Sequence, residues 1–546
     1  MERFDYVIVG AGSAGCVLAN RLSRDPSVRV LLLEAGTRTS GLWARMPAGI
    51  SRLALPNPNN WAYMSEPEPT MNGRRIYVPR GKGLGGSSAI NGMAYLRGNR
   101  SDYERWRQMG NPGWGWDDVL PHFMSIETRE GGDPAYRGRS GELHVTDPRV
   151  RYESSAAFVE ACVQSGVPRA RDINAPEGEG ASFLQFSIRD GERHSTATAF
   201  LDPVRGRPNL KVETEALAER VLIREGAARG VAYRRGTEAV TVEAGEVILA
   251  AGAIHSPKLL MQSGIGPGED LARHGIEVVH ELRGVGRNLQ DHVYLHSTFG
   301  ARNRGSINAS LVGPRAVLQG VVYLATRRGY LTMGASQAVA LTRVLPGAAS
   351  PDAQINFRPM SWAVDESGKV RIGSDEAVTV SSCQLVPESR GWLTLASADP
   401  AAAPEIHPNY LSTETDCRAA VAIIRKVRDI MSQPAIAPYL AEEREPGPKT
   451  ATDAEILAYV RAKGGNSMLH WAGSCRMGPD ADSVVDARLR VHGVGRLRVV
   501  DASIMPFISS GNTNAATIMI GEKGAAMILE DARSGAAAGA QVLEHA

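Results

Sequence analysis

The sequence predicts a mixed α/β and α+β protein in which two domains are interleaved along the chain. The 546 residues are too many for one ordinary core, because domains usually span about 100–200 residues. The first 36 residues are predicted to form a strand, a helix and a second strand. A strand that leads through a turn into a helix is predicted again near residue 250 and near residue 500. The segments between these points mix short strands with helices, which indicates a second domain inserted in pieces.

The opening unit carries glycines at the spacing that is typical of a Rossmann-like, dinucleotide-binding fold. An apolar strand is followed by Gly10, Gly12 and Gly15, then by a helical stretch and a second strand that ends at Glu34. Gly10 permits the tight turn, Gly12 lets the backbone approach a pyrophosphate, and Gly15 lets the helix pack on the strand. The helix N-terminus offers N–H groups to phosphates, and Glu34 stands where a carboxylate would bind ribose hydroxyls.

The next elements can be predicted in order. Residues 42–79 look irregular, and a loop of that length usually covers a ligand. Residues 81–91 form a glycine-rich loop with Ser87, Ser88 and Asn91, whose backbone can approach a flat or phosphate-bearing ligand. A plain glycine turn before a helix is the alternative. We expect helices over 101–110, 116–127, 153–167 and from 252, and strands over 210–214, 218–224, 229–234, 239–242 and 246–249.

The last third of the chain contains both strands and helices, and it ends with a strand, a loop and a helix that resemble the opening unit. We expect strands over 378–385, 392–395 and 497–501, and helices over 418–432, 453–462 and 513–529. The predicted dinucleotide-binding domain is therefore discontinuous, over residues 1–150, 205–293 and 465–532. The predicted substrate-binding domain, an antiparallel sheet with helices, takes residues 151–204 and 294–464. Residues 533–546, rich in Ala and Gly, are predicted to be a flexible tail.

Composition excludes several classes of protein. The net charge of +2 gives no electrostatic basis for binding nucleic acid or an anionic membrane. No run of about 18 apolar residues exists to span a bilayer, and a first strand predicted from residue 5 leaves no room for a signal peptide. Five scattered cysteines without a CxxC pair argue against a disulfide framework or a zinc site. We expect a cytoplasmic protein, and the sequence leaves peripheral membrane contact open.

Four longer motifs occur in a fixed order. Residues 81–98 read GKGLGGSSAINGMAYLRG, residues 252–266 read GAIHSPKLLMQSGIG, residues 284–292 read GVGRNLQDH, and residues 501–514 read DASIMPFISSGNTN. These motifs resemble the signatures of the glucose–methanol–choline (GMC) oxidoreductases. The resemblance runs from residue 5 to about residue 530, and within the family it is to bacterial alcohol dehydrogenases of the choline-dehydrogenase type.

The resemblance implies FAD rather than NAD as the cofactor. It places Trp61 near the adenine, the Val221 backbone at the adenine edge, and Asp501 near the pyrophosphate and flavin. Some family members attach FAD covalently through a histidine at the position of Ile90, so we expect a dissociable FAD here. The predicted cofactor residues are Gly10, Gly12, Ser13, Ala14, Gly15, Glu34, Ala35, Trp61, Gly81, Gly85, Gly86, Ser88, Asn91, Gly92, Ala94, Val221, Ala250, Gly252, Asp501, Ala502, Asn512, Thr513 and Thr517.

The resemblance also implies a catalytic pair, His470 and Asn512. Alcohol oxidation needs a base for the hydroxyl proton, and a neutral imidazole with a pKa near 6.5 suits that task. The alkoxide that forms needs hydrogen-bond donors, which histidinium and an amide both supply. Trp471 stands where many relatives have proline, which puts the local backbone and pocket shape in question. The apolar Met468 and Leu469 are expected in the substrate pocket beside Asn512.

Other histidines and Cys475 are interpreted first as structural. His292 and His296 have HxxxH spacing, but no acid or cysteine cluster accompanies them, so no metal site is expected. His255 at a helix start either faces the cofactor or caps the helix, and His194 is expected near the interface of the two domains. Cys475 is expected to be a small packed residue.

The predicted function is FAD-dependent oxidation of a primary alcohol to an aldehyde. His470 takes the hydroxyl proton, and hydride passes to flavin N5. The electrons then go to a quinone-type carrier or to oxygen, and we favour a dehydrogenase over an oxidase. Alternatives are a hydroxynitrile-lyase-like enzyme of the same fold and choline or sugar oxidation. A protein that only binds the flavin, or a plain NAD-dependent dehydrogenase, fits the motifs less well, since the latter leaves residues 81–91 unexplained.

Overall fold

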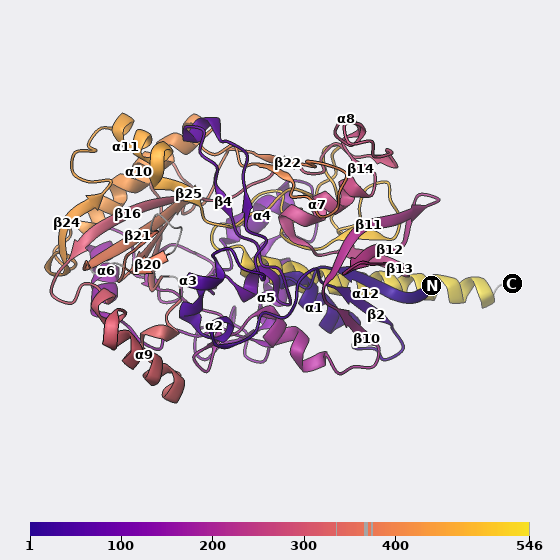
Figure 1. Ribbon diagram of the computed structural model, residues 1–546, viewed down its shortest axis with the longest axis horizontal. Helices are drawn as coiled ribbons and strands as arrows, with labels where there is room; N and C mark the ends of the chain where they lie inside the picture. Colours follow the sequence, from indigo (N-terminus) through magenta and orange to yellow (C-terminus); the bar gives the residue numbers. More distant parts are fainter. Residues whose placement is uncertain (335, 365–369, 373–374, 545–546) are drawn as a thin grey trace.

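The computed structural model describes residues 1–334, 336–364, 370–372 and 375–544. Two seven-stranded sheets organise the fold, one at each side of the molecule (Figure 1). The first contains, in spatial order, β10 (Leu210–Glu213), β2 (Val30–Leu33), β1 (Glu2–Val9), β13 (Glu238–Leu249), β12 (Ala227–Arg235) and β11 (Ala216–Arg224), with β26 (Leu497–Val499) beside β13.

The first sheet has the parallel core that the opening glycine motif predicted. β1 runs parallel to β2 and β13, and β26 runs parallel to β13, while β11 and β12 form an antiparallel extension. The strands β1, β2 and β13 are strongly apolar where they pass through the middle of the domain. The helices α1 (Ser13–Leu22) and α12 (Asn514–Glu544) pack against each other beside this sheet. The predicted α/β class of this domain is confirmed.

The second sheet is antiparallel throughout, which confirms the predicted α+β character of the other domain. Its spatial order is β24 (Leu440–Glu445), β16 (Val293–Ala301), β21 (Ala377–Gln384), β18 (Ala353–Arg358), β17 (Ala338–Thr342) and β7 (Gly180–Phe183), with β25 (Gly465–Ser467) also beside β16. β25 therefore belongs to this sheet, although the predicted boundary at residue 465 assigned it to the first domain.

Helices pack against both sheets. Two short helices and a two-stranded pairing occupy the segment 42–79 that was predicted to be irregular. Besides α1 and α12, the described α-helices are α2 (Leu42–Arg45), α3 (Ile50–Leu53), α4 (Arg100–Gln108), α5 (Trp116–Ile126), α6 (Glu153–Gln164), α7 (Gly252–Gln262), α8 (Gly268–Ala272), α9 (Gly313–Thr326), α10 (Glu414–Met431) and α11 (Asp453–Tyr459). None of the helices that the structure describes combines the length and apolar character needed to cross a bilayer.

Several element boundaries differ from the prediction for identifiable reasons. The expected strands 239–242 and 246–249 form one strand, β13, because Gly245 permits the close approach of β1 rather than a turn. A Cβ atom at Gly245 would lie 2.7 Å from the Asp5 carbonyl oxygen. α12 continues to Glu544, through most of the predicted flexible tail, since that segment is rich in alanine. Residues 545–546 of that tail lie outside the described residues.

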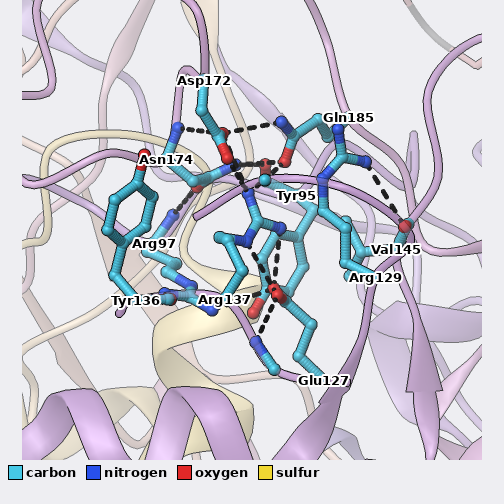
Figure 2. A network of polar contacts seen from close by, with 12 residues as sticks. Tyr95, Arg97, Glu127, Arg129, Tyr136, Arg137, Val145, Asp172, Asn174 and Gln185 are labelled. Atoms are coloured by element: carbon cyan, nitrogen blue, oxygen red, sulfur yellow. Dashed lines mark hydrogen bonds and ion pairs between the residues drawn. The ribbon is translucent and has the colours of Figure 1, made fainter. Parts of the chain in front are cut away.

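A buried ionic network fixes the chain just after the glycine-rich loop (Figure 2). The Arg137 guanidinium donates two hydrogen bonds to the Glu127 carboxylate, at 2.8 and 2.9 Å. It also donates to both oxygens of the Asp172 carboxylate, at 2.9 and 2.8 Å. Asn174 then accepts from the Arg97 backbone N–H at 2.7 Å and donates to the Tyr95 carbonyl at 3.0 Å. Removing one member of a buried ion pair costs about 3–5 kcal/mol. The network therefore anchors the backbone that carries the predicted flavin-binding loop.

Candidate active site

A cavity of about 1390 Å³ runs between the two sheets. It exceeds the roughly 300–1,000 Å³ of an ordinary small-molecule pocket, so it has room for a cofactor together with a substrate. Most of the predicted site residues lie on its wall. These are Gly10, Gly12, Ser13, Ala14, Glu34, Ala35, Trp61, Gly81, Gly86, Asn91, Gly92, Ala94, Ala250, Gly252, Met468, Leu469, His470, Asp501, Ala502, Asn512, Thr513 and Thr517.

Two helix N-termini meet at one end of this cavity. Gly12 is the N-cap of α1, and the first residue of α1, Ser13, donates from its hydroxyl to Asn514 Oδ1 at 2.7 Å. Asn514 is the first residue of α12, so the positive ends of both helix dipoles face the same space. Gly10 turns the chain with φ +102°, a conformation that favours glycine. This end of the cavity suits a pyrophosphate.

Glu34 lies on the cavity wall and also braces the glycine turn. Its carboxylate accepts hydrogen bonds from the backbone N–H groups of Ala11 and Gly36, each at 2.9 Å. Burial raises the pKa of the Glu34 carboxyl, while these backbone donors act in the opposite direction. The residue therefore holds the loop in shape from the position where a ribose would bind.

Flat side chains line the neighbouring wall. The Trp61 ring lies 4.4 Å from the His255 ring and 5.8 Å from Tyr63, and the Lys82 ammonium lies 4.5 Å from the Trp61 ring centre. The Tyr63 hydroxyl contacts His255 Nε2 at 2.7 Å. Burial lowers the pKa of His255 to about 3, which keeps this ring neutral. Of the two interpretations of His255, the structure favours the one in which it faces the cavity.

Gly15, Gly85, Ser88 and Val221 do not line the cavity. A Cβ atom on Gly15 would lie 1.8 Å from the Gly10 carbonyl oxygen, so Gly15 serves the packing of helix on turn, as predicted from the motif. The Ser88 hydroxyl contacts Thr196 Oγ1 at 2.8 Å and the Gly85 carbonyl at 2.6 Å. It therefore holds the loop from behind, and the contact with flavin or phosphate predicted for this residue stays a prediction.

Val221 does not line the cavity, and its predicted backbone contact with adenine stays a prediction. The Val221 N–H donates to the Ser263 hydroxyl at 2.8 Å and its side chain is buried in the first domain. The residues of β11 that reach the cavity are its first three, Ala216, Leu217 and Ala218. A register shift between Ala218 and Arg220 separates them from the rest of the strand, which simple alternation does not reveal.

Asp501 lies on the wall with its carboxylate already engaged by the protein. One oxygen accepts from the Gly252 N–H at 2.8 Å and from the Ser256 hydroxyl at 2.5 Å, and the other accepts from the Ser503 N–H at 2.8 Å. These bonds tie the start of α7 to the loop before α12. Asp501 thus shapes the cavity through the backbone that it fixes.

The predicted catalytic residues meet on the wall of the same cavity. His470 Nε2 and Asn512 Nδ2 lie 2.8 Å apart, although the residues belong to separate loops. Asn512 Oδ1 accepts from the Gln354 amide at 3.3 Å, which points the Asn512 NH₂ group toward the histidine. Burial, with smaller effects of His292 and Arg80, places the pKa of His470 well below its ordinary value of 6.5. The imidazole is therefore neutral near pH 7.

His292 determines which nitrogen of His470 carries the proton. His292 Nε2 lies 3.2 Å from the Leu385 carbonyl oxygen, which only accepts, so Nε2 carries the hydrogen. Burial lowers the pKa of His292 to about 4, so its ring is neutral and Nδ1 is an acceptor. His470 Nδ1, 2.9 Å away, must then donate to it. The lone pair of His470 is consequently on Nε2, the atom that faces Asn512 and the cavity.

Buried polar groups also fix the backbone around His470. Its N–H donates to Asp291 Oδ1 at 2.6 Å, and the other oxygen of Asp291 accepts from the Tyr410 hydroxyl at 2.5 Å. Burial raises the pKa of the Asp291 carboxyl to about 6. Arg80 donates to the Leu469 carbonyl at 2.7 Å, and Leu469 itself has φ +68°, in the left-handed region. The loop is held in one conformation from several directions.

The substitution of tryptophan for proline after His470 is accommodated by packing. The Trp471 ring is buried and lies 6.1 Å from the Tyr410 ring. The next residue, Ala472, exchanges two backbone hydrogen bonds with Gln290, each at 2.9 Å. These bonds hold the backbone after His470 to the Gly284–His292 motif, so the base keeps a defined position without the proline.

The HxxxH histidines both contact other protein groups. His292 contacts His470, as described above, while His296 contacts the Thr298 hydroxyl at 2.8 Å. Within the described residues, no three His, Cys, Asp or Glu side chains are grouped so as to hold a metal ion. His194 accepts from the His144 N–H at 3.2 Å, and Cys475 is buried in the core of the first domain.

Sequence reasoning missed the polar face of β18. Gln354, Asn356 and Arg358 alternate along this strand, and the last two line the cavity. The Gln354 amide donates to Asn356 Oδ1 at 3.0 Å as well as to Asn512. The sequence pattern that could have revealed this face is a polar residue at every second position of the otherwise apolar segment 353–358. Such alternation predicts a buried strand with one polar face.

Comparison with known proteins identifies the family. Residues 4–294 and 387–521 match the two models described as GMC oxidoreductase. The chain belongs to the GMC oxidoreductase family. It is 42% identical over 531 residues to the alcohol dehydrogenase (acceptor) of Pseudomonas putida, with 96% of each chain covered. It is 42% identical to the mitochondrial choline dehydrogenase of Homo sapiens, covering 96% of this chain and 90% of the relative. Among solved structures, pyridoxine 4-oxidase from Mesorbium loti superposes with a TM-score of 0.86 at 32% identity, covering 96% and 98% of the two chains.

Membership in this GMC family makes the protein an FAD-dependent oxidoreductase, and the cavity fits that cofactor. It joins paired helix N-termini for a pyrophosphate to a flat aromatic wall and to a histidine–asparagine pair. Gly252, with φ +84°, has no atom within 4 Å of where its Cβ would stand, so the wall is open at that point. Ile90 lines the cavity and offers no nucleophile for covalent attachment.

Proposed function

We propose that this enzyme oxidises a primary alcohol to an aldehyde, with His470 as the base. The observation that carries the proposal is the hydrogen-bond chain from the Leu385 carbonyl through His292 to His470, which leaves a lone pair on His470 Nε2. Oxidation of an alcohol needs a neutral group that accepts the hydroxyl proton, and His470 Nε2 is such a group. The depressed pKa of His470 supplies the neutral form at working pH.

The residues that would hold FAD are those of the cavity wall. The N-termini of α1 and α12 receive its pyrophosphate, Glu34 its ribose, and the loops 81–94 and 501–513 its flavin. When bound, FAD supplies the oxidising group that accepts a hydride from the alcohol carbon. The protein contributes the binding, the orientation and the proton transfer.

The proton transfer follows from the observed contacts. Asn512 Nδ2 now donates to His470 Nε2, and a substrate hydroxyl placed between them replaces that bond. His470 Nε2 accepts the hydroxyl proton, while Asn512 Nδ2 donates to the alkoxide oxygen that results. The histidinium retains its Nδ1–H bond to His292, and its new Nε2–H donates to the same oxygen. Both residues thereby stabilise the negative charge on that oxygen.

The charges of the cavity support an uncharged alcohol over a quaternary ammonium such as choline. Among the lining residues that the structure describes, the acids are Glu34 and Asp501, both at the cofactor end. Arg358 lies on the same face of β18 as Gln354, roughly 13 Å further along the strand at ~3.3 Å per residue. Among the described lining residues, this face of β18 therefore offers a cationic substrate an arginine and no carboxylate. Met468 and Leu469 beside the base suit an aliphatic or aromatic chain.

The test compares His470→Ala, Asn512→Ala and the control His296→Ala in anaerobic reduction of the bound flavin. We expect His470→Ala to keep FAD and to lose a factor of roughly 10²–10⁴ in reduction rate, the usual contribution of a positioned base. Asn512→Ala should lose less, and His296→Ala, outside the cavity lining, should lose little. Flavin reduction at the wild-type rate in His470→Ala would reject the assignment of the base. A panel that favours choline over butanol and benzyl alcohol would reject the substrate class.

The electron acceptor is a quinone-type carrier or oxygen, and we propose the former. The relatives include an acceptor-dependent alcohol dehydrogenase and an oxygen-dependent choline dehydrogenase. Admitting air to the reduced enzyme distinguishes the two for this chain. Slow return of the oxidised flavin spectrum, accelerated by a soluble quinone, supports a dehydrogenase, whereas rapid return in air alone indicates an oxidase.

A further inference from the structure

Helix α9 presents an apolar stripe to solvent. Val317, Leu318, Val321 and Leu324 are 69, 58, 57 and 56% exposed. They account for four of the eleven large apolar side chains that are exposed on the part of the chain described by the structure. Their spacing places them along one side of the helix, where a soluble helix normally carries polar residues. Figure 1 shows α9 at the outer edge of the molecule, beside the second sheet.

The other side of α9 closes the cavity. Ala316, Gly320 and Tyr323 line it, and Leu324 both lines it and reaches solvent. Arg327, at the C-terminal end of the helix, donates to Glu192 at 2.9 Å, and Arg45 of α2 lies 3.7 Å from the same carboxylate. The exposed stripe is therefore on the outside of a wall of the active-site cavity.

The segment of sequence that carries this stripe has charged residues of one sign. Residues 292–351 contain six arginines and no Asp, Glu or Lys. Arg315 and Arg328, at the two ends of α9, are both exposed. An apolar stripe flanked by cations is typical of a helix that lies in the interface of an anionic membrane. A second copy of the chain fits less well, because antiparallel pairing of two such helices would bring Arg315 of one copy against Arg328 of the other.

We propose that α9 docks this enzyme on the surface of an anionic lipid bilayer, with the stripe Val317–Leu318–Val321–Leu324 in the apolar boundary and the arginines at the headgroups. In that orientation the cavity wall faces the membrane, so an apolar alcohol or a quinone-type acceptor dissolved in the bilayer lies close to the cavity. The proposal does not depend on the catalytic assignment of His470.

Co-sedimentation of the FAD-loaded enzyme with vesicles tests the proposal. We expect binding to phosphatidylcholine vesicles that contain a quarter phosphatidylglycerol, weaker binding in high salt, and weaker binding to phosphatidylcholine alone. Val317→Ser with Leu318→Ser and Val321→Ser should lower the partition coefficient more than ~10-fold. Arg315→Ala with Arg328→Ala should lower it about 30-fold, at about fivefold for each cation.

A matched control removes exposed apolar side chains elsewhere. Val278 and Val279 are exposed in the first domain, between α8 and β15 (His280–Glu281), and Val278→Ser with Val279→Ser should bind vesicles like the wild type. The three serines on α9 replace side chains that do not line the cavity, so oxidation of a short soluble alcohol should be unchanged and shows that the variant is folded. Equal vesicle binding by the α9 variant and the control would overturn the proposal. So would a wild-type dimer in light scattering that the α9 serines dissociate.

Discussion

Replacing His292 by leucine is expected to slow catalysis without removing the base. The leucine cannot accept a hydrogen bond, so the Nδ1–H of His470 loses its 2.9 Å partner inside a buried site. An unsatisfied buried donor costs about 1–3 kcal/mol. Because the same bond holds the imidazole tautomer and supports the histidinium, we expect this cost in the barrier, which corresponds to a rate roughly 5- to 150-fold lower.

The assay is anaerobic stopped-flow reduction of the bound flavin at saturating alcohol, with two companion variants. His292→Asn places an amide oxygen on Cγ, where the histidine has Nδ1, and should recover most of the lost rate. His296→Leu makes the same change four residues later, on a histidine outside the cavity lining, and should leave the rate unchanged. If His292→Leu retains FAD and reduces it at the wild-type rate, the hydrogen-bond chain has no part in catalysis and the reasoning is refuted.

Three further predictions follow from the same contacts. Because burial lowers the pKa of His470, kcat/KM should stay on its plateau as the pH falls through 6.5 and decline only below it; a decline centred above 6.5 would contradict a buried neutral base. Gly15→Ala should lose FAD and lower Tm, since its Cβ would lie 1.8 Å from the Gly10 carbonyl oxygen, while Gly206→Ala, with no atom within 4 Å, should bind FAD normally. Acid precipitation should release the yellow colour into the supernatant, because Ile90 offers no attachment point; colour kept in the pellet would show a covalent bond.

Features carried by short stretches of sequence could be predicted. Gly10, Gly12 and Gly15 act on neighbours within one turn and helix, so their spacing alone indicates the nucleotide end of the cavity. The motif around His470 and the loop at Asn512 likewise identified residues that the fold brings within 2.8 Å.

Features that depend on distant contacts could not be predicted. His292 is 178 residues from His470, and its role follows from a contact between two loops that no local pattern encodes. The residues of β11 that line the cavity, Ala216 to Ala218, precede a register shift within the strand that the sequence pattern does not reveal. Helix α9 was not among the predicted elements, and its outward apolar stripe could not be predicted because burial is decided by tertiary packing.

Anaerobic titration of the purified, FAD-loaded enzyme with a series of primary alcohols tests the central claim most directly. We predict that the flavin bands bleach with aliphatic or aromatic primary alcohols, and that this bleaching is lost in His470→Ala while FAD stays bound. Flavin that remains oxidised with every alcohol tested would contradict alcohol oxidation and would favour a lyase in which the cofactor does not change redox state.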